Sequence, residues 1–500
     1  MREYRKILRN RKARIHRRLR RRQWGDQPKP MMSGSNIHYE MSIRTEAIGC
    51  GGIGAFHLLA QRIGLVDEIN KRLHLLKRHL PYFESDHVLN IAYNILVGGQ
   101  RLEDIELRRQ DAAFMNALGA QVLPDPTTAG DFTRRFEQPD IQTLMDCINT
   151  VRQVVWKLSR SVPFDEALID VDGTLAPTTG ECKQGMEYSY KGVWGYHPLI
   201  VSLANTEEVL FLENRPGNVA SHEGAAERID QAIALVGPHA NRICVRGDTA
   251  FYLTKHFDRW SENIDFVFGM DAYTNVRILA DSLSPQAWSP LHRKPKYEVQ
   301  TQERRRPKNV KEAIVKQRGF KNIRLVSEHV AEVPYQPAKC AKTYSLVIVR
   351  KNLSVEKGED LLFPDIRYFF YITTRTDLTA AEVVTLANGR CNQENVIDQL
   401  KNGVNAMRMP VDNLLSNWAY MVMAALAWNL KAWFAMLVPR RVRSACLLRM
   451  EFRQFLNSIM RVPCQILRSG RRIVYRFLSY NPWIHDFLST WEKIRKIKPA

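Results

Sequence analysis

The strongest constraint on the fold is a change in hydrophobic pattern that begins near residue 163. Before this point apolar residues recur at three- and four-residue spacing, as in amphipathic helices, whereas after it they form short runs typical of buried strands. Three strands, a helix and then further strands predict an α/β fold built on one sheet. The strands are expected at 167–169, 198–203, 209–212, 242–246 and 264–268, and the helix at 222–234.

Two of the predicted strands end in carboxylates. Asp170 and Asp172 lie two residues apart at the end of the first strand, so their side chains are expected on the same face. Asp248 follows the strand at 242–246 in the same way. A single Asp after a strand is usually a turn or helix-cap residue. Two such acids in one sheet, however, can share a divalent cation, because hard cations bind carboxylate oxygens and offset the cost of bringing negative charges together.

A third acid lies on a predicted helix. Arg390, Glu394 and Lys401 are four and seven residues apart, which places them on one helical stripe. In isolation this pattern indicates an exposed, salt-bridged face. Here the stripe follows the two strand acids in the order that two-metal phosphodiester chemistry needs, with three carboxylates to hold the ions. Arg390 and Lys401 would then bind phosphate.

The charge balance indicates a polyanionic partner. Lys and Arg number 73 against 52 Asp and Glu, a formal net charge of +21. Residues 1–22 hold twelve Lys or Arg and one acid, so we expect a disordered basic arm and linker over 1–44. The alternative is translated upstream sequence, with Met31 or Met32 as the true start.

Two segments are expected to contact DNA. The helical region 45–155 is the expected DNA-binding domain. In it, a Pro-Thr-Thr start opens a segment that carries Arg134 and Arg135, which is either the recognition helix of a helix-turn-helix or an ordinary capped surface helix. A β-rich basic insertion at 291–375 begins with twelve basic residues against three acids over 293–324, which favours a DNA-facing surface over a merely solvated one. Its expected DNA contacts are Arg304, Arg305, Arg306 and Lys308.

The remaining boundaries follow the hydrophobic pattern. The core is expected at 163–290 and again at 376–410, in the helix with the third acid, before a helical C-terminal region at 411–500. The apolar stretch 419–438 has the length of a membrane span, but Lys431 within it favours a buried core helix. Eight scattered cysteines fit a reducing compartment, and the arginine-rich start is unlike a secretory signal, so a cytoplasmic location is expected.

With these residues identified, the chain resembles the DDE transposases of bacterial insertion sequences. The resemblance runs from about residue 45 to about residue 480, to the group with a β-strand insertion before the last acid and a Tyr-Arg-Glu-Lys signature. The Tyr position of the signature, three residues before Arg390, is Ala387 here. The matching motifs are Asp172-Gly173-Thr174, Asp248 within Arg246-Gly247-Asp248-Thr249-Ala250-Phe251, and Arg390, Glu394 and Lys401.

The resemblance implies an RNase H-like catalytic core with an inserted β-rich subdomain and helical N-terminal and C-terminal regions. It implies that Asp172, Asp248 and Glu394 are the catalytic residues and bind two Mg²⁺ ions, for which Mn²⁺ would substitute. Arg390 and Lys401 are expected to support them, together with Asp170, which is either a metal ligand, a partner of the ligands or the true first acid. The implied reaction is cleavage and transfer of double-stranded DNA at terminal inverted repeats, by a homodimer associated with the bacterial nucleoid and not with a membrane.

Three other functions are compatible with parts of the pattern. An RNase H-like nuclease or junction resolvase would use the same acids without strand transfer, but the large insertion and helical front region favour a transposase. A non-catalytic DNA-binding protein fits the charge but leaves three placed acids unexplained. A glycosidase also uses two carboxylates, yet no aromatic sugar platform accompanies them and the basic charge would have no role.

Overall fold

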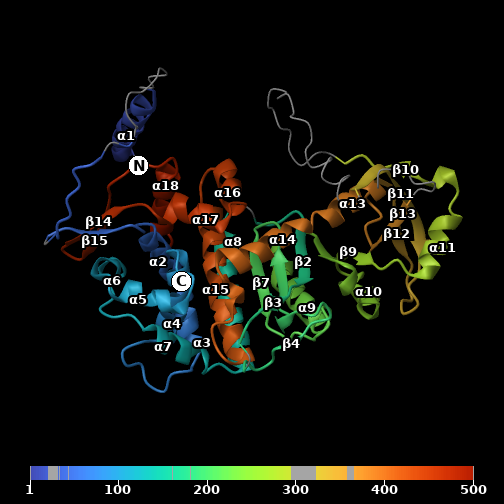
Figure 1. Cartoon of the computed structure of the whole chain (residues 1–500), viewed down its shortest axis with the longest axis horizontal. Coiled ribbons are helices and arrows are strands. Elements are labelled where there is room, and N and C mark those ends of the chain that lie inside the picture. The colour runs from blue at the N-terminus through green and yellow to red at the C-terminus, as the bar shows by residue number, and fades with distance from the viewer. Residues whose placement is uncertain are drawn as a thin grey trace.

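A computed structural model of the chain describes residues 2–20, 32, 34–42, 44–159, 162–180, 182–293, 322–356 and 365–498. Figure 1 shows a helical part in which N-terminal and C-terminal elements lie together, a central part with a sheet, and a strand-rich extension at the opposite end. The molecule is therefore elongated, and the central sheet joins its two ends.

Among the described residues, nine strands form one mixed sheet in the order β10-β11-β12-β13-β9-β8-β2-β6-β7. β2 pairs in parallel with β8, and β8 with β9, while the other neighbours are antiparallel. The α/β prediction is confirmed. The strands are β2 (Ala167–Gly173), β6 (Leu199–Leu203), β7 (Glu208–Glu213), β8 (Ile243–Gly247), β9 (Asp265–Met270), β10 (Ser289–Pro290), β11 (Asn322–Tyr335), β12 (Tyr344–Glu356) and β13 (Asp365–Thr373).

The strand-rich segment expected at 291–375 continues this sheet. β13 pairs with β9 through Tyr371↔Gly269 and Ile372↔Phe268, which satisfies the backbone groups that β9 would otherwise expose at the edge of the sheet. The alternating residues of β12 cover both faces, because successive side chains of a strand point to opposite sides. Val347 and Val349 pack with α13 (Ala380–Asn388), and Leu346 and Ile348 pack with α11 (Thr274–Ser282).

The helices that precede the sheet confirm the helical pattern expected over 45–155. They are α2 (Ile53–Arg62), α3 (Leu65–Arg72), α4 (Glu84–Leu96), α5 (Ile105–Arg109), α6 (Ala112–Leu118), α7 (Pro126–Thr133) and α8 (Gln138–Leu158). The later helices, besides α11 and α13, are α9 (Ala225–Val236), α10 (Thr254–Trp260), α14 (Cys391–Asp398), α15 (Leu414–Met436), α16 (Arg441–Leu448), α17 (Phe452–Phe455) and α18 (Ile484–Arg495). The short strands β3 (Ala176–Pro177), β4 (Glu187–Tyr188) and β5 (Trp194–Tyr196) form a small separate sheet.

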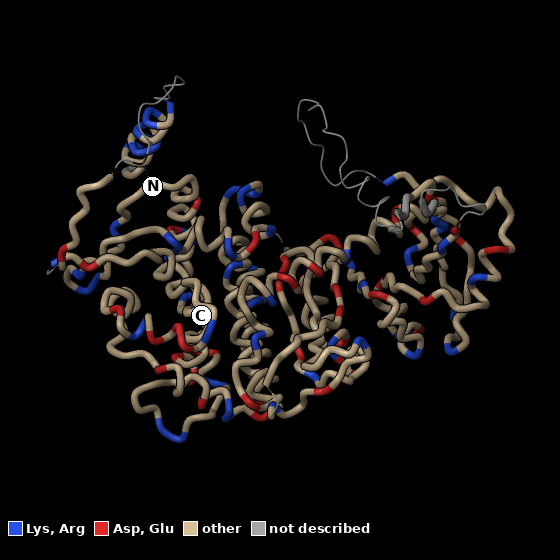
Figure 2. The backbone as a smooth tube through the Cα atoms, in the orientation of Figure 1, with Lys and Arg blue, Asp and Glu red and all other residues tan. Residues whose placement is uncertain are grey.

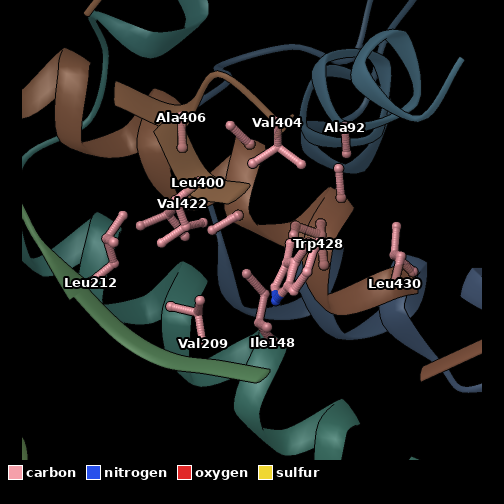
Figure 3. Packing of buried hydrophobic residues seen from close by; sticks show 14 of the residues in the cluster. Ala92, Ile148, Val209, Leu212, Leu400, Val404, Ala406, Val422, Trp428 and Leu430 are labelled. Atoms are coloured by element: carbon pink, nitrogen blue, oxygen red, sulfur yellow. The ribbon is translucent and has the colours of Figure 1, made fainter. Parts of the chain in front are cut away.

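Helix α15 is the centre of the hydrophobic core, as expected for the apolar stretch 419–438. Its residues 416–436 are all buried, and it packs against α4, α8 and β7. Figure 3 shows Trp428 of α15 beside Ile148 of α8 and Val209 of β7. The buried Lys431 donates a hydrogen bond to the carbonyl oxygen of Leu448 at 2.6 Å. Within the described residues, no helix combines the length and the apolarity that a bilayer crossing requires.

The C-terminal region is not wholly helical, so the prediction for 411–500 was wrong in part. β14 (Cys464–Ser469) and β15 (Arg472–Phe477) form a hairpin, and β1 (Glu46–Ile48) pairs with β14. The β-branched and aromatic residues of β15 favour a strand, and Gly470 takes the positive φ that the turn needs. This three-stranded sheet joins the two ends of the chain.

The prediction of a disordered basic arm was wrong for residues 2–20, which form helix α1 (Arg2–Arg20). Lys and Arg are good helix formers, and Arg11 anchors the helix by donating hydrogen bonds to the carbonyl oxygens of Phe477 at 3.2 Å and Ser479 at 3.0 Å. Figure 2 shows α1 as a densely basic helix that projects from the helical part. Residues 21–31 lie outside the described residues.

Candidate active site

Asp172 and Asp248 lie at adjacent strand ends. In the parallel pairing of β2 with β8, Asp170 is the partner of Arg246, so Asp172 and Asp248 each come two residues later along neighbouring strands. Asp248 then begins a 3₁₀ turn, and its carboxylate accepts a hydrogen bond from the backbone N–H of Ala250 at 2.9 Å. The sheet therefore brings together the two acids that the sequence selected.

Asp170 lies deeper in the same edge and is paired. Arg246 donates to its two carboxylate oxygens, from Nε at 2.7 Å and from Nη2 at 2.8 Å, and the two side chains are only 1% and 3% exposed. Burial raises the pKa of Asp170, and the guanidinium of Arg246 opposes that rise. Of the three roles expected for Asp170, this geometry fits a partner that holds the site, because both of its oxygens are already bound.

Arg246 also connects the sheet with the helix pair α13–α14. Its Nη1 donates to the carbonyl oxygen of Leu386 at 2.9 Å, near the end of α13. The next turn contains Gly389, where a Cβ atom would lie 2.5 Å from the same Nη1. Glycine is therefore required at this position for the helix to approach the guanidinium. No role is predicted for Arg246 from the sequence alone, although an Arg inside a predicted buried strand is a signal that it has a buried partner.

Gln393 docks α14 on the sheet and was not foreseen from the sequence. Its side chain is buried, and Nε2 donates to two backbone carbonyl oxygens, of Asp170 at 3.0 Å and of Ile200 at 3.1 Å. These carbonyls belong to the paired strands β2 and β6. Glu394, the next residue, is exposed in the first turn of α14. Gln393 thus fixes the helix that carries the third expected acid.

Arg390 forms an ion pair with the first expected acid. Its Nη1 lies 2.9 Å from Oδ2 of Asp172, and the side chains are 19% and 14% exposed. Burial alone would lower the pKa of Arg390, but the nearby carboxylates of Asp172, Asp248, Glu394 and Asp170 raise it above its ordinary value. The guanidinium therefore lies within the field of all four acids.

The second predicted base also lies near this group. Burial lowers the pKa of Lys401, and the carboxylates of Asp172 and Asp398 oppose that change. Burial raises the pKa of Asp172 to about 6, Arg390 opposes the rise, and the neighbouring Asp248 adds to it. Asp172 thus lies within electrostatic reach of Asp248, Arg390 and Lys401, and its carboxylate is costly to ionise.

The donor chemistry suits a divalent cation, but the arrangement does not yet form a complete site. Carboxylate oxygens are the ligands that Mg²⁺ prefers, and a cation would offset the burial and the like-charge repulsion at Asp172. Among the described residues, however, no three His, Cys, Asp or Glu side chains lie together closely enough to hold a metal ion. One oxygen of Asp172 instead binds Arg390.

A loop after β7 covers the residue that follows Asp172. Arg215 is buried and donates to the carbonyl oxygens of His197 at 2.9 Å, Ser221 at 3.1 Å and Glu223 at 2.6 Å. A Cβ atom at Gly173 would lie 2.9 Å from Nε2 of His197, which explains the need for a small residue after the acid. This loop therefore packs directly on the strand end.

The expected DNA contacts lie away from these acids or outside the described residues. Arg134 follows the end of α7 and pairs with Asp131 at 2.9 Å and Asp412 at 3.0 Å, while Arg135 is exposed. The carboxylate of Asp125 caps α7, which agrees with the alternative of a capped surface helix. Arg304, Arg305, Arg306 and Lys308 lie in the stretch 294–321, which is outside the described residues.

Comparison with known proteins identifies the family to which the chain belongs. The family model for the transposase DDE domain group 1 matches residues 46–499. No curated protein matches the chain. Among solved structures, the cryo-EM structure of the piggyBac transposase synaptic complex with hairpin DNA is similar at 11% sequence identity and a TM-score of 0.37, over 90% of this chain and 85% of that chain.

Proposed function

Because the chain belongs to the transposase DDE domain group 1 family, we propose that it cleaves and transfers DNA strands at the terminal inverted repeats of a bacterial insertion sequence. One observation carries the proposal beyond family membership. Asp172 and Asp248 end neighbouring parallel strands, and Gln393 holds the helix of Glu394 against the first of these strands. This arrangement supports a site to which three acids from distant parts of the chain contribute.

The sheet supports an RNase H-like core. The strands β7, β6, β2, β8 and β9 occur in space as the third, second, first, fourth and fifth core strands of the sequence. A helix, α9, separates the third strand from the fourth, as expected for that fold. On this reading β10 to β13 form the insertion before the last acid, and α14 is the helix that returns to the core.

Each residue of the site has a proposed task. Asp172, Asp248 and Glu394 would hold two Mg²⁺ ions, with Mn²⁺ able to substitute. When bound, such ions activate water or a terminal 3′-hydroxyl and stabilise the leaving oxygen. Arg390 and Lys401 would bind phosphate oxygens near the scissile bond, since cations form strong hydrogen bonds with phosphate. The pair of Asp170 with Arg246 would keep the strand ends in register.

The proposed partner is double-stranded DNA, bound by a homodimer that brings two element ends together. The net charge of +21 supports a polyanionic partner. In Figure 2 basic residues are dense on α1. The helical region 45–155 remains the proposed DNA-binding domain.

The test is Mg²⁺-dependent cleavage and strand transfer on DNA that carries the element's ends. Asp172→Asn, Asp248→Asn and Glu394→Gln should each abolish joining while DNA binding is kept. Glu382→Gln is the control, because Glu382 is an exposed acid in the first turn of α13, the helix before that of Glu394. Cleavage without joining by the wild type would instead support a nuclease, and binding without cleavage a DNA-binding protein.

A further inference from the structure

Arg390 binds one of the two carboxylate oxygens that Asp172 could offer to a divalent cation. Its Nη1 is 2.9 Å from Oδ2 of that carboxylate, and neither side chain is more than a fifth exposed. The guanidinium carries a positive charge at every physiological pH and so does for Asp172 what a metal ion would do. An oxygen that accepts this hydrogen bond is less available to a cation, and the like charges of cation and guanidinium repel each other.

The surroundings of Arg390 show why it rests there without a substrate. The nearby acids Asp172, Asp248, Glu394 and Asp170 together raise its pKa. The backbone brings it there, because Arg390 directly follows Gly389, which packs on Arg246, and precedes the docked Gln393. The turn between α13 and α14 therefore fixes the backbone position from which the guanidinium of Arg390 reaches Asp172.

We propose that Arg390 keeps the metal site closed in the free protein, and that a DNA phosphate opens the site by drawing the guanidinium away from Asp172. The proposal rests on the proposed function, since it uses the same acids and the same substrate. A phosphate near the scissile bond offers Arg390 a bidentate partner, which competes with a single hydrogen bond to Asp172. DNA binding and metal binding then assist each other by the same factor, as linkage requires.

The first test measures Mn²⁺ binding in the absence of DNA, with the electron paramagnetic resonance signal of the free ion as the readout. Binding at the site is defined as the Mn²⁺ binding that the wild type or an Arg390 variant shows and that is lost when Asp172→Asn is introduced. Arg390→Ala should raise this affinity by roughly tenfold or more, because an opposite charge within hydrogen-bonding distance strongly affects a partly buried carboxylate. Arg390→Lys, which keeps the charge, should stay close to the wild type and guards against loss of folding in the alanine variant.

Arg443→Ala provides the matched control. Arg443 forms an ion pair of the same 2.9 Å length with Asp486, in the C-terminal region between α16 and α18. Its removal should leave Mn²⁺ affinity unchanged. Equal, measurable site affinity in the wild type and Arg390→Ala would overturn this inference alone. Absence of Asp172-dependent Mn²⁺ binding even in Arg390→Ala would overturn the proposed function together with it.

The second test measures the linkage in the wild-type protein. The affinity for a mixed-sequence duplex of about 20 base pairs, which covers a standard protein–DNA contact, is measured at constant ionic strength with and without Mn²⁺. The wild type should bind the duplex more tightly in the presence of Mn²⁺. In Arg390→Ala this gain in DNA affinity should be smaller, and equal to the gain measured for Asp172→Asn. The same gain in wild type and Arg390→Ala would contradict the proposed opening of the site by phosphate.

Discussion

Arg246 binds both carboxylate oxygens of Asp170, at 2.7 Å and 2.8 Å, and the two side chains are almost fully buried between β8 and β2. Removing one partner of a buried ion pair leaves the other charge uncompensated, which costs about 3 to 5 kcal/mol. We predict a loss of this size in the free energy of unfolding for Arg246→Ala, measured by urea denaturation. Asp170→Leu combined with Arg246→Met should lose less than the sum of the single variants, and an additive loss would contradict a direct interaction.

Gln393 is predicted to position Glu394 rather than to take part in chemistry. Gln393→Ala removes both hydrogen bonds to the carbonyls of β2 and β6, so α14 is no longer held in register. Because small misplacements of a catalytic group are costly, kcat for strand cleavage should fall by about tenfold to hundredfold while KM for DNA changes little. Asn395→Ala, at an exposed position of the same helix, is the control. A rise in KM with unchanged kcat would contradict the positioning role.

The carboxyl group of Asp172 gives the site a defined pH dependence. Burial raises its pKa from 3.8 to about 6, so the folded protein binds this proton more tightly than the unfolded chain does. The contribution of Asp172 to folding stability therefore decreases as the pH rises from 3.8 to about 6. Cations bind the ionised form, so Mn²⁺ affinity should fall by roughly tenfold per pH unit below the pKa. A flat Mn²⁺ titration between about pH 5 and about pH 8 would refute this assignment.

Lys431 should make stability depend on pH in the alkaline range. Burial lowers its pKa from 10.5 to about 7, with Glu207 opposing the change, so between these values the unfolded chain binds more protons than the folded one. The free energy of unfolding should accordingly increase with pH from about 7 to 10.5. Lys431→Met keeps the packing against Trp428 and should remove this increase. Urea midpoints at the two ends of the range, compared between variant and wild type, test the prediction.

The sequence predicted the strands that carry Asp172 and Asp248 because the pattern that identifies them is local. Asp172 and Asp248 each follow a short apolar run typical of a buried strand, and the helical stripe of Arg390 and Glu394 is visible in residue spacing. The ion pair of Asp170 with Arg246 joins residues 76 positions apart, so no local pattern reveals it. It depends on the parallel register of two strands, which only the folded sheet determines.

Other features escaped prediction because tertiary contacts decide them. The hairpin of β14 and β15 combines basic and aromatic residues that also fit a helix, and it is stabilised by β1 from the other end of the chain. The charge density of residues 2–20 predicts a segment that repels itself. In the folded protein, Arg11 donates hydrogen bonds to two carbonyl oxygens of the C-terminal region, and this long-range contact holds helix α1. In the sequence Gln393 resembles any other polar residue of a helix. Only the folded structure shows that its amide donates hydrogen bonds to the backbone carbonyls of β2 and β6.

The pairing of β13 with β9 has a mechanical consequence. β9 is hydrogen-bonded to β8 on one side and to β13 on the other, so an unbroken ladder runs from the strand end of Asp248 to the outer strands. A ladder of this kind resists in-plane separation of its strands, so the outer strands stay in the same sheet as the strand that ends at Asp248. The distance between the acids and any ligand that binds to β11 or β12 is therefore set by the number of strands between them.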